Sequence, residues 1–362
     1  MSKIIIDARE YSTSTGRYIS ELITNLEKID EKNDYVVLLK PEDYAKVKFT
    51  NPHFTPEVTP FKEFSLGEQT GFAKQLYSLK ADLVHFGMTQ QPMLYLKKSV
   101  TTIHDLTTVR FTNPDKNKYV FLIKQQVYKV VVWYAAHKSK RVITDSEYVK
   151  NDVVQYAHIK TKKVSVIHAA AEPIKDSTQP IKELQNQKFI MYIGRPMPHK
   201  NLWRLIEAFK VLKSTHPDLA LVLAGKLDNN YKDIQARVKR ESIEGVVFSG
   251  FVSEGELKWL YEHTQAYIFP SLSEGFGLPG LEAMAQGAVV ASSNATCLPE
   301  IYGDAAHYFD PLDTQAMAKA IDDVLSDEKL RAKLISLGHQ QVSKYSWRRT
   351  AEETLAVYNA VL

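Results

Sequence analysis

Residues 266–291 read Ala-Tyr-Ile-Phe-Pro-Ser-Leu-Ser-Glu-Gly-Phe-Gly-Leu-Pro-Gly-Leu-Glu-Ala-Met-Ala-Gln-Gly-Ala-Val-Val-Ala. The apolar runs at 266–269 and 288–291 have the length and composition of buried strands, and 278–286 between them has the pattern of a helix. Strands that are buried on both faces occur in parallel sheets, where a helix carries the chain from one strand to the next. The stretch therefore predicts one β–α–β unit of an α/β fold.

The same alternation extends outward from this unit to both ends of the chain. The first half predicts strands at 3–7, 35–39, 83–86, 99–104, 141–144 and 164–168, with helices at about 16–30, 65–80, 115–138 and 147–157. The second half predicts further strands at 189–193, 219–224 and 246–249, with helices at 201–214, 230–242, 254–263 and from 313 onward. Two doubly wound parallel sheets are expected.

A break in this rhythm divides the chain. Residues 171–187 contain Pro173, Pro180 and a polar string without apolar period, and 362 residues suit two domains rather than one. We expect a first domain at 1–170, a linker at 171–187, a second domain at 188–345, and a C-terminal helix at 346–362 that packs back on the first domain. Open α/β sheets bind ligands at the carboxyl ends of their strands, so both sets of strand ends are expected to face one cleft.

Composition excludes several classes of protein. The longest apolar run, Val130 to Ala136, is seven residues, whereas a bilayer span takes about 20. The first residues, Met-Ser-Lys-Ile-Ile-Ile-Asp, lack the features of a signal peptide, and the single cysteine, Cys297, forms neither an internal disulfide nor a cysteine cluster. A cytoplasmic protein is expected. The net charge of +4 is too small to indicate nucleic acid, although residues 1–170 hold 25 Lys and Arg against 18 Asp and Glu.

Gly275, Gly277 and Gly280 match the G-x-G-x-x-G pattern of dinucleotide-binding turns. A nicotinamide site also needs an acid at the end of the next strand, and that strand ends Ser292-Ser293-Asn294. The sequence therefore disfavours a dehydrogenase.

Glu274 and Glu282 lie eight residues apart on either side of these glycines. A glycine-rich loop at a helix N-terminus exposes backbone N–H groups to an anion, and flanking carboxylates accept hydrogen bonds from sugar hydroxyls. The alternative is a solvated helix residue at Glu282 and a capping residue at Glu274.

A second loop, Gly194-Arg195-Pro-Met-Pro-His-Lys200-Asn201, follows the first strand of the second domain and holds two cations five residues apart. The guanidinium of arginine can bind two phosphate oxygens at once, and the ammonium of lysine adds a second positive charge. The loop is therefore suited to bind a diphosphate. The alternative is two surface charges beside a plain helix cap at Asn201.

These stretches together resemble the retaining, nucleotide-sugar-dependent glycosyltransferases of family four, also called group 1, over nearly the whole chain. The shared marks are Glu274 to Glu282 in Ser-Glu-Gly-Phe-Gly-Leu-Pro-Gly-Leu-Glu-Ala, Gly-Arg and Lys-Asn within 194–201, and Val-Phe-Ser-Gly-Phe-Val at 247–252 before Glu256-Leu257. The resemblance implies the GT-B fold, an α/β architecture of two Rossmann-like domains, with the acceptor on the first and the donor on the second.

The resemblance also implies a role for each matching residue of the second domain. Arg195 and Lys200 would hold the donor diphosphate, Glu282 the ribose hydroxyls and Glu274 the sugar hydroxyls. Backbone amides would come from Phe276, Gly277 and Leu278, and the nucleobase would lie against Phe251 and Val252.

In the first domain, His104-Asp105-Leu106 resembles the His-Asp-Leu of the family, whose histidine reaches the donor sugar. Gly16 belongs to a loop that often reads Gly-x-Gly-Arg-Tyr in the family and is Ser14-Thr15-Gly16-Arg17-Tyr18 here. His85 is interpreted as a structural residue and Asp145-Ser146 as a helix cap, while the role of His199 stays open.

As a whole, the resemblance implies an enzyme that transfers a hexose with retention, without metal or cofactor, to a glycan or lipid-linked acceptor of cell-surface polysaccharide synthesis. Mannose from GDP-mannose is the expected donor, with rhamnose next. A nucleotide-sugar epimerase and a non-catalytic nucleotide-sugar-binding subunit remain as alternatives. The chain carries no Asp-x-Asp triplet, in keeping with metal independence.

Residues 115–141 hold seven Lys and Arg against one acid, with five aromatic residues among them. Two interpretations stay open. Lys116, Lys118, Lys124 and Lys129 bring the first domain reversibly to an anionic membrane surface, or a stripe of Val127, Val130, Val131 and Tyr134 packs on the sheet and leaves the lysines solvated.

Overall fold

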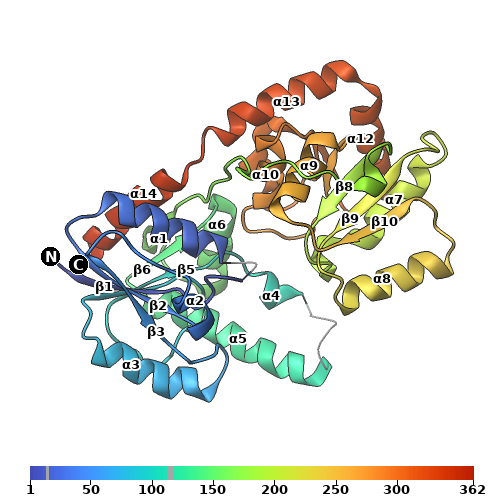
Figure 1. The fold of residues 1–362 in the computed structure, drawn as a ribbon. Coiled ribbons are helices and arrows are strands. Elements are labelled where there is room, and N and C mark those ends of the chain that lie inside the picture. Colours follow the sequence, from blue (N-terminus) through green and yellow to red (C-terminus); the bar gives the residue numbers. More distant parts are fainter. Residues whose placement is uncertain (14–15, 112–117) are drawn as a thin grey trace. The chain divides into compact units, whose positions relative to one another are not determined.

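The protein is described from a computed structural model, which covers residues 1–13, 16–111 and 118–362. The chain forms two compact units (Figure 1). The first comprises residues 1–109, 123–169 and 346–362, and the second comprises 110–122 and 170–345. The C-terminal helix thus belongs to the first unit. Ser14, Thr15 and Lys116 lie outside the described residues.

The first unit is built on a parallel sheet in the order β3-β2-β1-β4-β5-β6-β7. Its strands are β1 Lys3–Asp7, β2 Asp34–Leu39, β3 Phe54–Val58, β4 Leu83–Phe86, β5 Ser99–Thr102, β6 Arg141–Thr144 and β7 Val164–Val166. Ile4, Ile5 and Ile6 are all fully buried, as expected of a central strand that is covered on both faces.

The helices that cover this sheet are α1 Arg17–Ile29, α2 Pro41–Tyr44, α3 Ala73–Ser78, α4 Thr107–Arg110, α5 Lys118–Lys138, α6 Glu147–Ala157 and α14 Trp347–Val361. Helix α3 packs on Val84 and Phe86 of β4. His85 lies between these two residues and therefore points to the opposite face, where it meets Tyr358 of α14. Ser146 caps α6 by accepting a hydrogen bond from the Val149 amide, which confirms the cap interpretation for Ser146. For Asp145 the interpretation is wrong, because its carboxylate pairs with His104.

The second unit is built on a parallel sheet in the order β10-β9-β8-β11-β12-β13. Its strands are β8 Phe189–Ile193, β9 Ala220–Ala224, β10 Val246–Gly250, β11 Tyr267–Phe269, β12 Val290–Ser293 and β13 Ala306–Phe309. Its helices are α7 Leu202–Leu212, α8 Asn229–Arg240, α9 Glu254–His263, α10 Leu278–Ala285, α11 Leu298–Tyr302, α12 Thr314–Ser326 and α13 Glu328–Val342. The predicted α/β class with two parallel sheets is confirmed.

The sequence analysis did not predict two of the edge strands, β3 and β13. Strand β3 carries Pro56, which cannot donate to a neighbouring strand and is tolerated at an edge. Strand β13 closes the other sheet with only four residues. The strand predicted at 99–104 is shorter, because it ends at Thr102 and leaves His104 in the following loop.

The stretch predicted as a linker is bound to the second unit. The Gln179 amide donates to the Gly255 carbonyl at 3.0 Å, and the Lys258 ammonium donates to the Asp176 carbonyl at 3.1 Å. Both partners lie on α9. Since the backbone of this stretch is hydrogen-bonded to a helix, the absence of an apolar period did not mean an absence of structure.

The predicted apolar stripe of α5 is wrong in part. Val131 is buried and the Tyr134 hydroxyl donates to the Met93 carbonyl at 2.8 Å, but Val127 and Val130 are more than half exposed. The core is made instead by Tyr128, Val132 and Ala136 of this helix.

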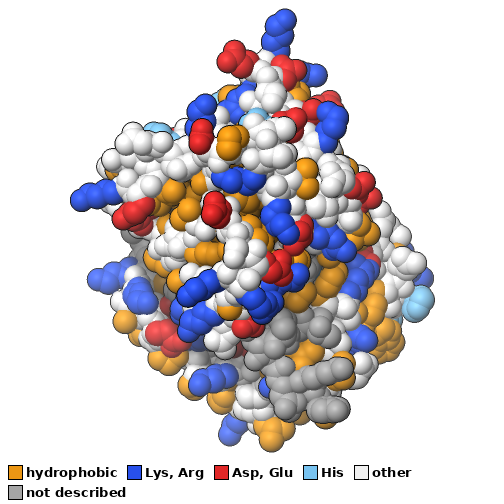
Figure 2. Space-filling model, turned by 90° about the vertical axis from the view of Figure 1, so that its right-hand side faces the viewer, with side chains coloured by type: hydrophobic (Ala, Val, Ile, Leu, Met, Phe, Trp, Pro, Cys, Tyr) orange, Lys and Arg blue, Asp and Glu red, His pale blue; other side chains and the backbone are white. Residues whose placement is uncertain are grey.

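Charged side chains of both signs occur at the surface. On the face that Figure 2 shows, Lys and Arg side chains lie among Asp and Glu side chains. Such a mixture of charges is ordinary for a surface exposed to solvent.

Candidate active site

His104 lies just beyond the carboxyl end of β5 in the first unit. Its Nδ1 is 2.6 Å from the Asp145 carboxylate, at the end of β6, and its Nε2 is 3.1 Å from the Gly87 carbonyl, at the end of β4. Both partners only accept hydrogen bonds, so the geometry favours a ring that is protonated at both nitrogens. Burial acts to lower the pKa of His104, but the charge and hydrogen bond of Asp145 outweigh it and raise the pKa above its ordinary value.

A cavity of about 170 Å³ opens beside His104 at the same edge of the sheet. Its lining includes three carboxylates and the amide of Gln90, groups that can bind the hydroxyls of a sugar. The lining residues are Asp7, Glu10, Ile19, Gly87, Met88, Thr89, Gln90, His104, Asp105, Thr108 and Tyr128.

Beneath this cavity lies a fully buried arginine that sequence reasoning did not single out. Arg9 donates to both carboxylate oxygens of Asp7, at 2.9 and 2.8 Å, and its Nη1 is 2.9 Å from Glu68. The guanidinium also stacks over the Phe72 ring at 4.1 Å. Burial opposes the charge of Arg9, yet the acids around it raise its pKa above the ordinary value.

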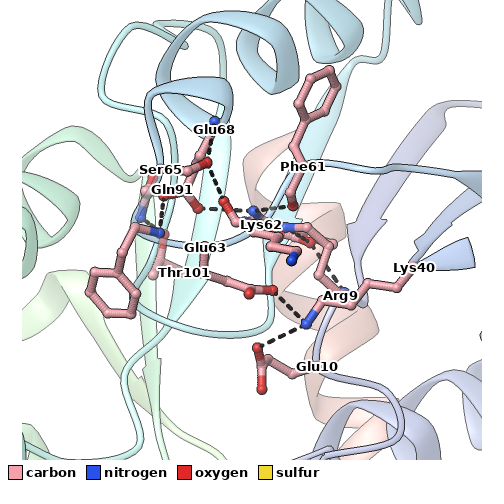
Figure 3. A network of polar contacts seen from close by, with 12 residues as sticks. Arg9, Glu10, Lys40, Phe61, Lys62, Glu63, Ser65, Glu68, Gln91 and Thr101 are labelled. Carbon is pink, nitrogen blue, oxygen red and sulfur yellow. Dashed lines mark hydrogen bonds and ion pairs between the residues drawn. The ribbon is translucent and has the colours of Figure 1, made fainter. Parts of the chain in front are cut away.

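The network continues to the cavity wall through a shared lysine (Figure 3). Lys40 lies 3.0 Å from Glu63 and 3.6 Å from Glu10, and Glu10 lines the cavity. Burial and the nearby charge of Glu63 raise the pKa of Glu10, while Glu63 itself has a lowered pKa because Lys40 and Arg9 stabilise its charge against burial. Ion pairs with Arg9 and Lys40 therefore hold Asp7 and Glu10 in place at the cavity wall.

His85 is structural, as interpreted from the sequence. It is fully buried, with Nδ1 2.6 Å from the Tyr358 hydroxyl and Nε2 2.9 Å from the Thr102 hydroxyl. Burial lowers the pKa of His85 to about 3, so the ring is neutral. The Tyr18 hydroxyl shares the Thr102 oxygen at 3.1 Å, and its ring meets His104 edge-on at 4.7 Å.

In the second unit, the two predicted loops meet at the carboxyl edge of the sheet. The Lys200 ammonium is 2.7 Å from the Glu274 carboxylate, and the Leu272 amide donates to the His199 carbonyl at 2.7 Å. Both charged side chains are partly exposed, at 21% and 12%. The structure thus brings together Lys200 and Glu274, which the sequence places 74 residues apart.

The other predicted cation has a carboxylate that the sequence analysis missed. Arg195 Nε donates to Asp228 at 2.8 Å, and the Arg195 side chain is 58% exposed. Asp228 also caps α8 by accepting a hydrogen bond from the Tyr231 amide at 3.1 Å. The available signal was an Asp directly before a helical pattern, which indicates a cap but not an ion pair.

Asn201 stands at the N-cap position of α7, as the alternative interpretation of its loop supposed, but its side chain does not cap the helix. It adopts a left-handed conformation with φ of 60°, and its side chain makes no capping hydrogen bond. Its amide instead donates to the carbonyls of Pro270 and Pro311, at 3.1 and 2.8 Å. Asn201 therefore joins the lysine loop to the glutamate loop.

The glycines of the glutamate loop have a packing reason. Gly277 has φ of 86°, and a side chain there would lie 2.5 Å from the Tyr302 hydroxyl. A side chain at Gly280 would lie 2.3 Å from the same oxygen. Close contact with Tyr302 thus fixes the start of α10, at Leu278.

The remaining predicted residues differ in exposure. Glu282 is buried on α10 at 9%, whereas Phe251 is 81% exposed in the loop after β10 and Val252 is half-buried. Phe276 is buried against the Tyr345 ring at 5.6 Å. Gly16 is packed so tightly on the backbone of Glu10 and Tyr11 that no side chain fits, and its amide donates to the Thr13 carbonyl.

Comparison with known protein families shows to which family a chain with these loops belongs. Residues 15–173 match the sequence profile of Glycosyltransferase Family 4, and residues 174–341 match that of Glycosyl transferases group 1. The chain belongs to this family of glycosyltransferases. Lys200, Glu274 and Glu282 all fall within the second profile, and His104 falls within the first.

Curated relatives of this glycosyltransferase include proteins of O-antigen synthesis. O-antigen chain mannosyltransferase B of Escherichia coli is 28% identical over 276 residues, which are 73% of this chain and 70% of that protein. O-antigen chain mannosyltransferase RfbU of Salmonella typhimurium is 27% identical, over 65% of this chain and 63% of that protein. Serotype-specific mannosyltransferase WbdA of Escherichia coli is 29% identical over 62% of this chain, which spans only 29% of WbdA.

Solved structures match the fold over the whole glycosyltransferase chain. Sucrose-phosphate synthase from Thermosynechococcus elongatus superimposes with a TM-score of 0.77 at 17% identity, covering 99% of both chains. Anabaena HepE in complex with UDP and glucose superimposes with a TM-score of 0.74 at 20% identity, covering 99% of this chain and all of that one. The predicted GT-B fold is confirmed.

Proposed function

We propose that this glycosyltransferase moves a hexose, in the first place mannose from GDP-mannose, to a glycan or lipid-linked acceptor of cell-surface polysaccharide. The observation that carries the proposal is the meeting of Lys200 and Glu274, with Arg195 on the same edge of the second sheet, in loops that match the family. The names of the curated relatives support mannose and a surface polysaccharide.

The proposed chemistry depends on the charge of the leaving group. As the bond from the sugar to the diphosphate breaks, negative charge grows on the phosphate oxygens and the sugar carbon becomes cation-like. Arg195 and Lys200 would stabilise that negative charge, the kind of electrostatic effect that usually dominates such catalysis. Lys200 would leave or share its bond with Glu274 when the diphosphate binds, and Glu274 would then accept hydrogen bonds from the sugar hydroxyls.

In this proposal, the first unit supplies the acceptor side. The cavity beside His104 would hold an acceptor sugar, and Asp145 would keep the His104 ring oriented through Nδ1. With retention, attack would come from the same face as departure, and a phosphate oxygen of the donor would accept the proton of the acceptor hydroxyl. The two organic cations would stand in place of a metal ion, so no metal or cofactor is proposed.

A transfer assay with an added acceptor tests this function against its alternatives. A glycosyltransferase gives a longer acceptor with the anomeric configuration of the donor, which NMR of the product reports. An epimerase changes the donor alone, and a binding subunit changes neither. Transfer with inverted configuration would refute retention, and no transfer to any polysaccharide or lipid-linked acceptor would refute the proposal.

The donor is tested by thermal shift with sugar nucleotides of GDP, UDP, ADP and dTDP. Ligands that bind the native state raise its melting temperature according to their concentration relative to Kd. The expected result is the largest shift with GDP-mannose. A larger shift with UDP-glucose would replace mannose by glucose and leave the transferase assignment in place.

Metal independence is tested in the same transfer assay. Activity is expected to survive excess EDTA, because Arg195 and Lys200 supply the positive charge. Loss of activity that Mg²⁺ or Mn²⁺ restores would refute this part of the proposal.

The proposed place of work is the cytoplasmic side of a membrane, with reversible contact through residues 115–141. Lys116 and the side chain of Lys118 lie outside the described part of the chain, so the proposed contact rests on the remainder of the helix. None of the described helices is both long and apolar enough to cross a bilayer. Neither nucleic acid nor a particular oligomeric state is part of the proposal.

A further inference from the structure

Helix α5 presents an apolar face to solvent within the first unit. Ile123, Val127, Val130 and Trp133 are 67%, 54%, 55% and 46% exposed. Their spacing of four, three and three residues places them along one side of the helix. The opposite side forms the core through Tyr128, Val132 and Ala136. We call the four exposed residues the apolar face.

A basic depression of about 600 Å³ lies at the C-terminal end of the same helix. Its lining is five cations, two histidines and one isoleucine, and no acid is among the lining residues that the structure describes. We call it the cationic hollow; it is lined by His137, Lys140, Arg141, His158, Ile159, Lys160, Lys162 and Lys163.

Hydrogen bonds from two of its cations to backbone carbonyls hold the hollow in shape. The Arg141 guanidinium donates to the Lys162 carbonyl, and the Lys163 ammonium donates to the His137 carbonyl, so the segment after α6 is tied to the start of β6 and to the end of α5. Burial and the charge of Lys140 lower the pKa of Lys163, so like charges crowd this site. Crowded cations of this kind are relieved when an anion binds.

The hollow and the apolar face are continuous. The ring of Trp133, on the apolar face, meets the ring of His137, on the hollow wall, with centroids 4.0 Å apart. A phosphate in the hollow would therefore lie at the end of a row of apolar side chains. This order of groups matches a phospholipid, whose charged head adjoins its apolar chains.

We propose that the cationic hollow binds the phosphate of anionic lipid headgroups while the apolar face enters the membrane interface, so that α5 docks the first unit on an anionic bilayer. Charge complementarity and the adjoining apolar side chains together favour a lipid surface over nucleic acid, which offers phosphates without an apolar layer. The inference gives the proposed membrane contact a surface of its own, and it does not depend on the identity of the donor sugar.

The docking surface leaves the candidate acceptor cavity uncovered. Arg141, in the hollow, starts β6, whereas Asp145, which holds His104, follows the end of β6. The hollow and His104 thus lie at opposite edges of the sheet. Tyr128 of α5 lines the cavity and His137 of α5 lines the hollow, so the helix connects the membrane surface to the acceptor site.

Co-sedimentation with vesicles tests the proposal. The wild-type protein is expected to pellet with phosphatidylcholine vesicles that contain phosphatidylglycerol, to stay in solution with phosphatidylcholine alone, and to be released by high salt. Replacing Lys140, Lys160 and Lys162 by Gln should weaken binding about 100-fold, at about 5-fold for each cation near the surface.

A matched control separates the hollow from overall charge. Lys46, Lys48 and Lys74 are exposed lysines of the same unit, and replacing all three by Gln removes the same charge elsewhere. This control should bind vesicles almost like the wild type. Equal loss in both triple variants, or no loss in the hollow variant, would overturn the proposal, as would binding of duplex DNA that outcompetes anionic vesicles.

The apolar face is tested separately through Trp133. Its emission should shift to shorter wavelength with anionic vesicles, and the shift should vanish in Trp133→Phe and in Val127→Ser/Val130→Ser. Trp259 and Trp347 are buried and Trp203 is partly exposed beneath the Arg237 guanidinium, so these three give the background emission that Trp133→Phe measures. An unchanged spectrum with bound vesicles would remove the apolar face from the docking surface. Donor binding by the same hollow variant should equal that of wild type, which distinguishes failure here from failure of the transferase proposal.

Discussion

The arginines at the carboxyl edges of the two sheets differ in burial. In the first unit Arg9 is fully buried between Asp7 and Glu68, and Lys40 is shared by Glu10 and Glu63. In the second unit Arg195 is mostly exposed and pairs with Asp228. Buried pairs lose much stability when one partner is removed, whereas exposed pairs contribute little and exchange partners easily. Arg9 is thus a fixed part of the first edge, whereas Arg195 of the second stays accessible to a ligand; Lys40 and Lys200, at 20% and 21% exposed, are alike in this respect.

The largest expected effect is at Arg9. Arg9→Met should lower the free energy of unfolding by about 3–5 kcal/mol, because Asp7 and Glu68 are left as buried charges without their cation. Arg195→Met makes the same chemical change at the exposed pair and should cost about 0–1 kcal/mol. Urea unfolding followed by circular dichroism measures both. Equal losses in the two variants would contradict the contrast between the two arginines.

Next comes the effect on turnover at the second edge. Arg195→Ala and Lys200→Ala should each lower kcat by about 10²–10³-fold, because each removes charge that the leaving diphosphate needs. Lys210→Ala, at a partly exposed lysine of α7 in the same unit, is the matched control and should keep the wild-type kcat. Near wild-type kcat with saturating donor in either site variant would show that the diphosphate is held elsewhere.

The two glutamates should separate binding from chemistry. Glu282→Ala should mainly weaken nucleotide binding, because ribose contacts are equal in the ground and transition states, while Glu274→Ala should lower kcat more. Glu274→Ala also releases the Lys200 ammonium from its carboxylate. Calorimetric titration with the free nucleoside diphosphate checks the assignment. Unchanged affinity in Glu282→Ala would exclude the ribose role.

The smallest effect concerns acid sensitivity of the first unit. His85 has a pKa of about 3 in the folded protein, below the ordinary 6.5 of the unfolded chain. As pH falls below 6.5, the unfolded state binds a proton that folded His85 does not, so this residue lowers stability by up to about 1.4 kcal/mol per pH unit. His104 acts in the opposite sense, because its raised pKa adds stability that is lost as pH rises through its folded value.

The experiment compares unfolding midpoints at about pH 7 and about pH 5. His85→Gln should show a smaller loss on acidification than the wild type, and His104→Gln a larger one. Parallel changes in all three proteins would show that neither histidine contributes to the pH dependence.

Local sequence patterns predicted most of the strands and helices of the fold. Apolar runs such as Ile4 to Ile6 are buried on both sides whatever their partners, so β1 could be predicted from its own residues. Strand β3 could not, because Pro56 is compatible with a strand only at an edge, and edge position depends on the rest of the sheet. The exposed side of α5 was also mispredicted, since Val127 and Val131 look alike until the sheet decides which side is covered.

The sequence by itself determined the α/β class, the loops at 194–201 and 270–282, and the residue types that suit a sugar nucleotide, because these depend on neighbours within a few positions. Only the tertiary structure decided which charges meet. Lys200 and Glu274 are 74 positions apart, and His104 and Asp145 are 41 apart. No local pattern set Arg9 apart in the sequence. It is a buried charge because β1 lies inside the sheet and the helical turn at 68–72, which carries Glu68 and Phe72, packs on it. Contacts between distant residues follow from how strands are ordered, which no local pattern records.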